Sequence, residues 1–362
     1  MEPTAEANSA RDKLGRHLRD LRISVTDRCN FRCPYCMPKE VFGPGHAFLD
    51  RSSLLTFEEL AELVAVFASL GVRKVRLTGG EPLLRREIES LVAKIALVPE
   101  IEDLALTTNG MLLAAKAQAL ASAGLKRVTV SLDALDQEHF AAMNGVGARV
   151  DKVLAGIEAA ALAGLAPIKI NCVIRRGVND TEILALVRRF RGTGHIVRFI
   201  EYMDVGTTNG WKPEDVVPAS EILEKISSEF PIEPIDPTLP GEVATRYRFS
   251  DGSGEIGVIA SITQPFCKEC TRARLSADGH LFTCLFASNG TDLRDMVRSG
   301  ATASQLAQRI ASVWKARDDR YSELRDELIE MTARQGQPAN LSATPVAVRP
   351  PRRRAEMSYL GG

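Results

Sequence analysis

The chain has 362 residues, which is enough for one large domain with a smaller region beside it. Its 46 Lys and Arg residues balance its 46 Asp and Glu residues, so overall charge does not favour nucleic acid or a membrane surface as a partner. No apolar run approaches the about 18 residues of a membrane span, and residues 1–20 lack the apolar core of a signal peptide, so we expect a cytoplasmic protein.

Three cysteines follow the first expected strand. Residues 1–16, rich in alanine and charge, are predicted to form a loose arm, and a strand is expected at 19–26. The next residues are Cys29-Asn-Phe-Arg-Cys33-Pro-Tyr-Cys36, with the spacing C-x3-C-x2-C. Three thiolates that hold a cluster of four irons leave one iron open to a small ligand. A zinc loop that lacks one ligand, or a redox-active pair with a spare thiol, is the alternative.

Helices and short strands then alternate. Thr56 and Glu59 form a capping-box pattern that starts a helix, which ends at Gly71. The same order of helix, glycine or loop, and strand recurs along the chain. The strands expected after the first one are at 74–78, 104–107, 127–131, 168–173 and 196–200. Six strands alternating with helices predict a parallel sheet that curves into a partial (β/α)6 TIM-type barrel, with ligand groups just after each strand.

Polar residues do follow these strands. After the second strand comes Gly79-Gly80-Glu81-Pro82, where glycine allows close approach of the backbone to a ligand and the carboxylate offers an acceptor. Other polar residues near strand ends are Thr107, Ser131, Asp133, Lys169, Asn171 and Asp204. Each alone is more typical of a cap or a turn, but together they would lie at one rim of the barrel.

A second region is expected after the barrel. Residues 213–241 are rich in proline around one helix and connect the barrel, at 17–240, to an α+β region at 241–333. This region begins with an antiparallel hairpin at 246–249 and 256–262, and further helices are expected at 293–297, 304–314 and 318–331. A tail at 334–362 ends in two glycines, which are slim enough to enter a cavity.

The second group of cysteines is Cys267, Cys270 and Cys284. Its spacing, C-x2-C-x13-C, is open to two interpretations, a zinc site completed by His280 or an iron–sulfur cluster. Arg272 and Arg274 lie beside it, and their forked guanidinium groups match phosphate oxygens. They favour an anionic substrate, although a solvated strand face would show the same i, i+2 pattern. Cys172 lies outside both groups and is expected to be a buried strand thiol.

The first loop, C-x3-C-x-Tyr-C, resembles the signature of the radical S-adenosylmethionine (SAM) superfamily. Three further motifs narrow the resemblance, over residues 18–362, to the GTP 3',8-cyclase family of molybdenum cofactor biosynthesis. They are Arg-Ile-Ser-Val-Thr-Asp-Arg-Cys, the second group with its Arg-x-Arg, and the end Met-Ser-Tyr-Leu-Gly-Gly. Many relatives have Ile where this chain has the Leu.

The resemblance implies two 4Fe-4S clusters, SAM as co-substrate and GTP as substrate, and it decides against zinc at the second group. The implied cluster ligands are Cys29, Cys33, Cys36, Cys267, Cys270 and Cys284. The implied SAM contacts are Tyr35, Gly80, Ser131 and Met203. The implied GTP contacts are Arg22, Arg76, Thr107, Lys169, Arg272 and Arg274, and Gly361 and Gly362 are implied to support catalysis.

The reaction that the resemblance implies converts GTP into (8S)-3',8-cyclo-7,8-dihydroguanosine 5'-triphosphate, while SAM is cleaved to methionine and 5'-deoxyadenosine. It also implies an electron donor such as flavodoxin or ferredoxin and transfer of the product to cyclic pyranopterin monophosphate synthase, and it allows a homodimer. One alternative is another radical SAM enzyme with an auxiliary cluster, such as a peptide-modifying maturase, which usually has more cysteines. A metal-stabilised nucleic-acid-binding protein that uses residues 352–354 leaves the rim residues unexplained.

Overall fold

The computed structural model describes residues 10–238, 241–325 and 354–361. Its strands form one twelve-stranded sheet in the order β12-β11-β10-β1-β2-β3-β4-β5-β6-β9-β8-β7. The strands are β1 (Asp20–Ser24), β2 (Lys74–Thr78), β3 (Asp103–Thr108), β4 (Arg127–Ser131), β5 (Lys169–Ile174), β6 (Ile196–Glu201), β7 (Ile232–Ile235), β8 (Thr245–Phe249), β9 (Glu255–Ile259), β10 (Arg272–Leu275), β11 (His280–Phe282) and β12 (Thr291–Asp292). The helices are α1 (Phe57–Ser69), α2 (Ile88–Ala96), α3 (Leu113–Ser122), α4 (Gln137–Asn144), α5 (Val150–Leu162), α6 (Glu182–Phe190), α7 (Ala219–Ser227), α8 (Arg294–Arg298), α9 (Ala303–Lys315) and α11 (Met357–Leu360).

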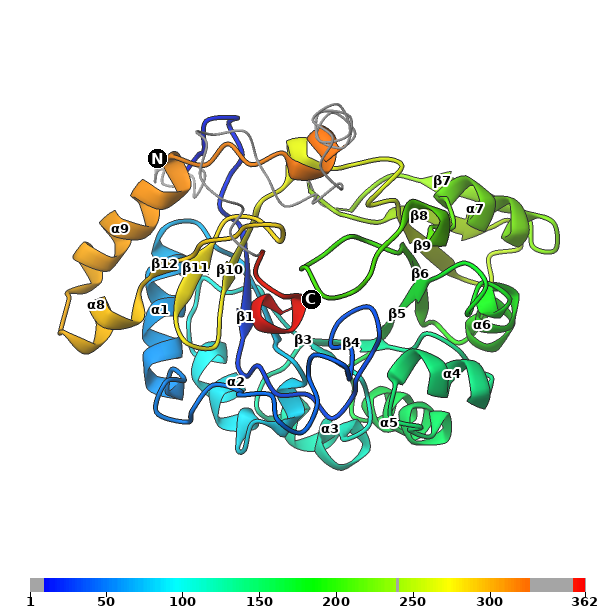
Figure 1. Ribbon diagram of the computed structural model, residues 1–362, viewed down its shortest axis with the longest axis horizontal. Helices are drawn as coiled ribbons and strands as arrows, with labels where there is room; N and C mark the ends of the chain where they lie inside the picture. The colour runs from blue at the N-terminus through cyan, green and yellow to red at the C-terminus, as the bar shows by residue number, and fades with distance from the viewer. Residues whose placement is uncertain (1–9, 239–240, 326–353, 362) are drawn as a thin grey trace.

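Strands β1 to β6 form the core of the barrel. Each is the parallel neighbour of the next strand in chain order. Helices α1 to α6 connect these strands and cover the outer face of the curved sheet (Figure 1). This arrangement confirms the predicted partial (β/α)6 TIM-type barrel. Because parallel strands end at the same edge, the loops after them share one rim.

Helix α1 illustrates how the sequence pattern produces the core. Thr56 accepts a hydrogen bond from the Glu59 amide, and the Glu59 carboxylate accepts one from the Thr56 amide, which completes the expected capping box. Leu60, Leu63 and Phe67 recur at helical spacing and are buried. They belong to the same apolar core as the buried residues of the sheet, so α1 packs on its outer face.

The C-terminal region joins both edges of the barrel sheet. Strand β10 pairs in parallel with β1, and β9 pairs in parallel with β6. Beyond them, β11 and β12 extend one edge and β8 and β7 the other, all by antiparallel pairing. The hairpin expected at 246–249 and 256–262 is therefore confirmed. The α+β region expected after residue 240 continues the barrel sheet and does not form a sheet of its own.

Residues 10–16 are not the loose arm that composition predicts for 1–16. Asp12 and Arg16 are buried and form an ion pair of 2.5 Å, and the Trp314 indole donates to the Arg16 carbonyl at 3.0 Å. Pairing within the protein replaces solvation of these charges. Residues 1–9, the tail from 334 to 353 and part of the helix expected at 318–331 lie outside the described residues. Of the helices described, none is long and apolar enough to cross a membrane.

Candidate active site

Both groups of cysteines line one cavity of about 300 Å³, a size typical of small-molecule sites. The first group lies in the loop after β1, and the second group lies on either side of the β10–β11 pair. The pairing of β10 with β1 brings the two groups to the same part of the sheet. The cysteines that line the cavity are Cys29, Cys33, Cys36, Cys267, Cys270 and Cys284.

The first cysteine loop is shaped by hydrogen bonds from its own arginine. Arg32 donates from Nη1 to the carbonyls of Cys29 at 2.8 Å and Phe31 at 2.7 Å, and from Nε to the carbonyl of Phe42 at 2.7 Å. Gly80, two residues after the end of β2, lies against this loop. A Cβ atom there would lie 2.3 Å from the carbonyl oxygen of Arg28, so only glycine permits this approach.

The donor set of the first loop fits an iron–sulfur cluster. Burial raises the pKa of Cys29 to about 11 and also raises the pKa values of Cys33 and Cys36, so these thiols need a nearby positive centre to ionise. Within the described ranges, no three His, Cys, Asp or Glu side chains lie close enough together to hold a single metal ion. Three cysteines that line the same cavity supply the kind of ligand that a 4Fe-4S cluster prefers.

The residues implied for SAM line the cavity beside the first loop. Tyr35 donates its hydroxyl to Asp133 at 2.7 Å, and Asp133 also accepts from the Val173 amide at 2.8 Å. Burial raises the pKa of Asp133 to about 6. The residues implied for SAM that line the cavity are Tyr35, Gly80, Ser131 and Met203.

Glu81 has a different position from the one its motif suggests. Its carboxylate accepts from the Thr108 hydroxyl at 2.8 Å and from the Asn109 amide at 2.8 Å. It is buried, and it is not among the residues that line the cavity. The acceptor expected after β2 therefore stabilises the turn after β3 and does not face the cavity.

Arginines line the other part of the cavity, beyond the first cysteine loop. The register of the paired strands brings them to one face of the sheet. Arg22 on β1 is the register partner of Arg76 on β2 and of Arg274 on β10, so all three side chains lie on one face of the sheet. Arg272, two residues before Arg274, shares that face. Arg76 also donates to the hydroxyl of Thr107 at 3.0 Å. Arg22, Arg76, Thr107, Arg272 and Arg274 all line the cavity.

These cations form a candidate site for an anion. Burial and the neighbouring arginines lower the pKa of Arg22 and that of Arg76 to about 10, so both are still protonated at neutral pH. The Nε atoms of both side chains are buried and have no hydrogen-bond partner among the described residues. Buried charges are costly unless an opposite charge pairs with them, so this wall of the cavity favours a polyanionic ligand.

At β5 and β6 the residues that line the cavity differ from those expected, and Lys169 as a GTP contact stays a prediction. Lys169 does not line the cavity, although burial and nearby Arg198 lower its pKa to about 7. Arg198 does line it, and sequence analysis missed this residue. The available signal was a single charge inside the apolar strand Ile196-Val-Arg-Phe-Ile200.

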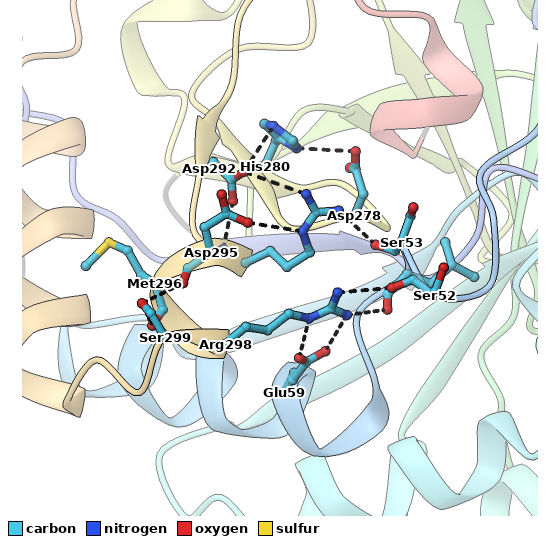
Figure 2. A network of polar contacts seen from close by, with 12 residues as sticks. Ser52, Ser53, Glu59, Asp278, His280, Asp292, Asp295, Met296, Arg298 and Ser299 are labelled. Atoms are coloured by element: carbon cyan, nitrogen blue, oxygen red, sulfur yellow. Dashed lines mark hydrogen bonds and ion pairs between the residues drawn. The ribbon is translucent and has the colours of Figure 1, made fainter.

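His280 does not complete a zinc site with the second group of cysteines. Its Nδ1 lies 3.3 Å from a carboxylate oxygen of Asp278, and its Nε2 lies 3.8 Å from one of Asp292. Figure 2 shows the ring between these two carboxylates, in a network that continues through Arg298 to Glu59 on α1. The hydrogen bond with Asp278 raises the pKa of His280.

The end of the tail reaches the arginines. Helix α11 lies inside the curve of the sheet (Figure 1), and the carbonyl of Gly361 accepts a hydrogen bond from Arg274. A Cβ atom at Gly361 would lie 2.2 Å from Cγ2 of Thr78, which also lines the cavity. A glycine is therefore needed there. Gly362 lies outside the described residues.

Comparisons with known proteins agree with this site. Residues 23–190 match the radical SAM superfamily, and residues 195–323 match the family described as Molybdenum Cofactor Synthesis C. The chain is 57% identical to the GTP 3',8-cyclase of Acidothermus cellulolyticus, over 97% of this chain and 99% of that protein. It is 46% identical to the GTP 3',8-cyclase of Staphylococcus aureus (strain JH9), over 97% of this chain and 98% of that protein.

A solved structure has the same fold. Streptococcus suis SuiB bound to S-adenosylmethionine is similar with a TM-score of 0.57, over 83% of this chain and 69% of that chain. At 16% sequence identity this likeness concerns the fold alone. The sequence identities to the cyclases extend over nearly the whole chain and include both matched regions. The chain therefore belongs to the GTP 3',8-cyclase family of the radical SAM superfamily.

Proposed function

We propose that this protein is a GTP 3',8-cyclase that performs the first step of molybdenum cofactor biosynthesis. It converts GTP into (8S)-3',8-cyclo-7,8-dihydroguanosine 5'-triphosphate and cleaves SAM to methionine and 5'-deoxyadenosine. The observation that supports this most directly is the single cavity, which is lined by both groups of cysteines and by the arginines between them. Membership of the family supplies the identity of the two substrates.

The first group of cysteines is proposed to hold the cluster that reacts with SAM. Cys29, Cys33 and Cys36 would hold a 4Fe-4S cluster, which would supply the electron for cleavage of the carbon–sulfur bond of SAM. Tyr35, fixed by Asp133, and Ser131 line the cavity and are proposed to orient the adenosyl group beside that loop. The 5'-deoxyadenosyl radical then takes the hydrogen atom from C3' of GTP, and C3' bonds to C8.

The second half of the cavity is proposed to hold GTP. Arg22, Arg76 and Arg198 are proposed to contact the triphosphate, since all three line the cavity; Arg76 is buried, and Arg22 and Arg198 are half-buried. Cys267, Cys270 and Cys284 are proposed to hold the second 4Fe-4S cluster, whose open iron would bind the guanine base.

The remaining wall limits side reactions. Val173, Ile200 and Ile259 line the cavity between the polar groups. Their apolar surface keeps water and other hydrogen donors away from a carbon radical. Holding C3' of the ribose near the adenosyl carbon and near C8 is then the main task of the polar residues.

The cellular setting is proposed from family membership. We infer that the enzyme works in the cytoplasm, takes electrons from a donor such as flavodoxin or ferredoxin, and passes its product to cyclic pyranopterin monophosphate synthase. The homodimer allowed by the sequence stays a prediction. Sedimentation of the anaerobic protein would measure it.

Isotope transfer tests the proposed reaction. The protein is reconstituted anaerobically with iron and sulfide and incubated with SAM, dithionite and GTP deuterated at C3'. We expect deuterium in 5'-deoxyadenosine. We also expect a new compound that has the mass of unlabelled GTP but a different retention time. The new compound is an isomer of unlabelled GTP because one hydrogen atom leaves C3' and one electron and one proton are added after ring closure. Unlabelled 5'-deoxyadenosine with unchanged GTP would contradict the proposal.

A further inference from the structure

Cys270 differs from the other cavity cysteines in having two arginines at its sulfur. Nη2 of Arg317 lies 3.2 Å from Sγ of Cys270, and Nη2 of Arg272 lies 3.3 Å from the same atom. Both distances are hydrogen-bond distances for a sulfur acceptor. Both arginines line the cavity. Arg272 is also a candidate GTP contact, whereas Arg317 comes from the segment after α9.

Arg317 is held in one orientation. Its Nη1 donates to the carbonyl of Cys270 at 2.7 Å, and its Nε lies 3.3 Å from a carboxylate oxygen of Asp319. Its guanidinium lies 4.5 Å from the ring centroid of Trp314, and its side chain is 1% exposed. Asp12 lies 3.5 Å from Nη1. With Nη1 and Nε occupied in this way, Nη2 is directed at the sulfur.

Positive charge gathers beside the sulfur of Cys270, because Arg272 and Arg317 each direct a guanidinium nitrogen at it. Asp12 and Asp319 offset part of the positive charge of Arg317 and of nearby Arg16. The two direct N–H···S contacts are the distinctive feature of Cys270.

We propose that Arg317 is a positioning residue that holds the Cys270 thiolate and raises the reduction potential of the second 4Fe-4S cluster. This rests on the proposed function only in that Cys267, Cys270 and Cys284 hold such a cluster. Hydrogen bonds to a ligand sulfur and positive charge beside it stabilise the reduced form of a cluster more than the oxidised form. Arg272 contributes in the same way while it is at the sulfur, but Arg317 is 1% exposed and is held by the Cys270 carbonyl and by Asp319, so it is the residue to test.

A redox titration of Arg317→Gln tests this role. The titration follows the reduced-cluster signal by electron paramagnetic resonance in a background with Cys29, Cys33 and Cys36 changed to Ser, so that only the second cluster contributes. We expect the midpoint potential of Arg317→Gln to be more negative than that of the parent. Arg317→Lys keeps the positive charge but loses the forked guanidinium group. The midpoint potential of the cluster in this variant is expected to lie between those of the parent and Arg317→Gln.

Arg16→Gln is the matched control. Arg16 belongs to the same buried group of charges, but it donates to the backbone carbonyl of Cys267 at 2.8 Å and not to a sulfur. Its replacement should shift the potential less than Arg317→Gln does. Equal shifts in the two variants, or no shift in Arg317→Gln, would overturn the proposal.

Iron analysis checks that each variant still holds its cluster. Each variant should retain the iron and sulfide of one cluster, measured before the titration. Loss of the cluster in both Arg317→Gln and Arg317→Lys would also overturn the proposal, because Arg317 would then build the site and not set its potential. The titration needs neither GTP nor SAM, so a protein that failed to cyclise GTP could still show the expected shift.

Discussion

Arg274 donates a hydrogen bond to the main-chain carbonyl of Gly361, and this contact joins the end of the chain to the arginines of the cavity. The two residues are far apart in the sequence. They meet because Arg274 lies on β10, beside β1, and because α11 lies inside the curved sheet (Figure 1). Met357, in the same C-terminal segment, lines the cavity, so the end of the chain forms part of the cavity wall, and the first two predictions concern it.

Gly361→Ala is expected to lower kcat/KM for cyclised product by about tenfold, which corresponds to ~1.4 kcal/mol. The new Cβ would lie 2.2 Å from Cγ2 of Thr78, at a residue whose φ is +75°. Rates of product formation measure the effect. Thr78→Ser removes the methyl group in contact and should restore part of the activity of Gly361→Ala. Full activity in Gly361→Ala alone would contradict the close contact.

Tyr359→Phe should loosen the tail. The Tyr359 hydroxyl donates to Asp278, with distances of 2.7 and 2.9 Å to its two carboxylate oxygens. Loss of a hydrogen bond to a charged group costs roughly 1.5–3 kcal/mol, so product formation should fall about tenfold or more. A double-mutant cycle with Asp278→Asn measures the coupling. If the two effects simply added, the contact would not be what positions the tail.

Arg198→Ala should weaken GTP binding about 10- to 100-fold, as expected for loss of one charge-assisted contact of ~1.5–3 kcal/mol. Equilibrium dialysis of GTP against anaerobically reconstituted protein measures this. Arg127→Ala is the control, because Arg127 pairs with Asp103 and does not line the cavity. Equal losses in both variants would mean that the effect is general and not local.

Cys33→Ser should abolish formation of 5'-deoxyadenosine, because the first cluster loses one of its three ligands. Cys172→Ser is the matched control, since Cys172 is a buried thiol that does not line the cavity. It should retain SAM cleavage. Liquid chromatography of the reaction with SAM and dithionite measures both, and SAM cleavage at the parent rate by Cys33→Ser would count against the assignment.

Glu81 should make stability depend on pH. Burial raises its pKa from 4.5 to about 7, so its folded pKa lies above the unfolded value. Its contribution to stability is therefore full below about pH 4.5 and is lost as the pH rises through about 7. Relative to Glu81→Gln, the unfolding free energy of the parent should fall by roughly 3 kcal/mol from pH 4.5 to about 8. Urea unfolding at the two pH values measures this, and a difference independent of pH would refute it.

The barrel could be predicted because the sequence patterns that indicate its helices and strands are local. The capping box at Thr56 and Glu59, and the order of helix and strand, specify β1 to β6 without reference to distant residues. The six cavity cysteines could likewise be chosen from spacing and resemblance, and all of them line the cavity. Spacing alone did not exclude zinc at the second group.

The parts that sequence analysis missed depend on contacts between distant segments. Strand β10 has only four residues, two of them arginines, and nothing local indicates that it pairs with β1. The burial of Asp12 and Arg16 likewise depends on partners about 300 residues away, such as Trp314. Arg198 was missed because the sequence does not show toward which face of the sheet a strand side chain points. That face is known only once the register of the sheet is known.

The attachment of C-terminal strands to both β1 and β6 has a consequence for how the protein can be divided. A fragment that ended near residue 240 would leave the β1 edge unpaired and would remove β9 from beside β6. Unpaired strand edges recruit other chains, so such a fragment should aggregate and not behave as an independent barrel. The boundary between the two family matches, near residues 190–195, likewise lies within one continuous sheet and does not mark a unit that folds on its own.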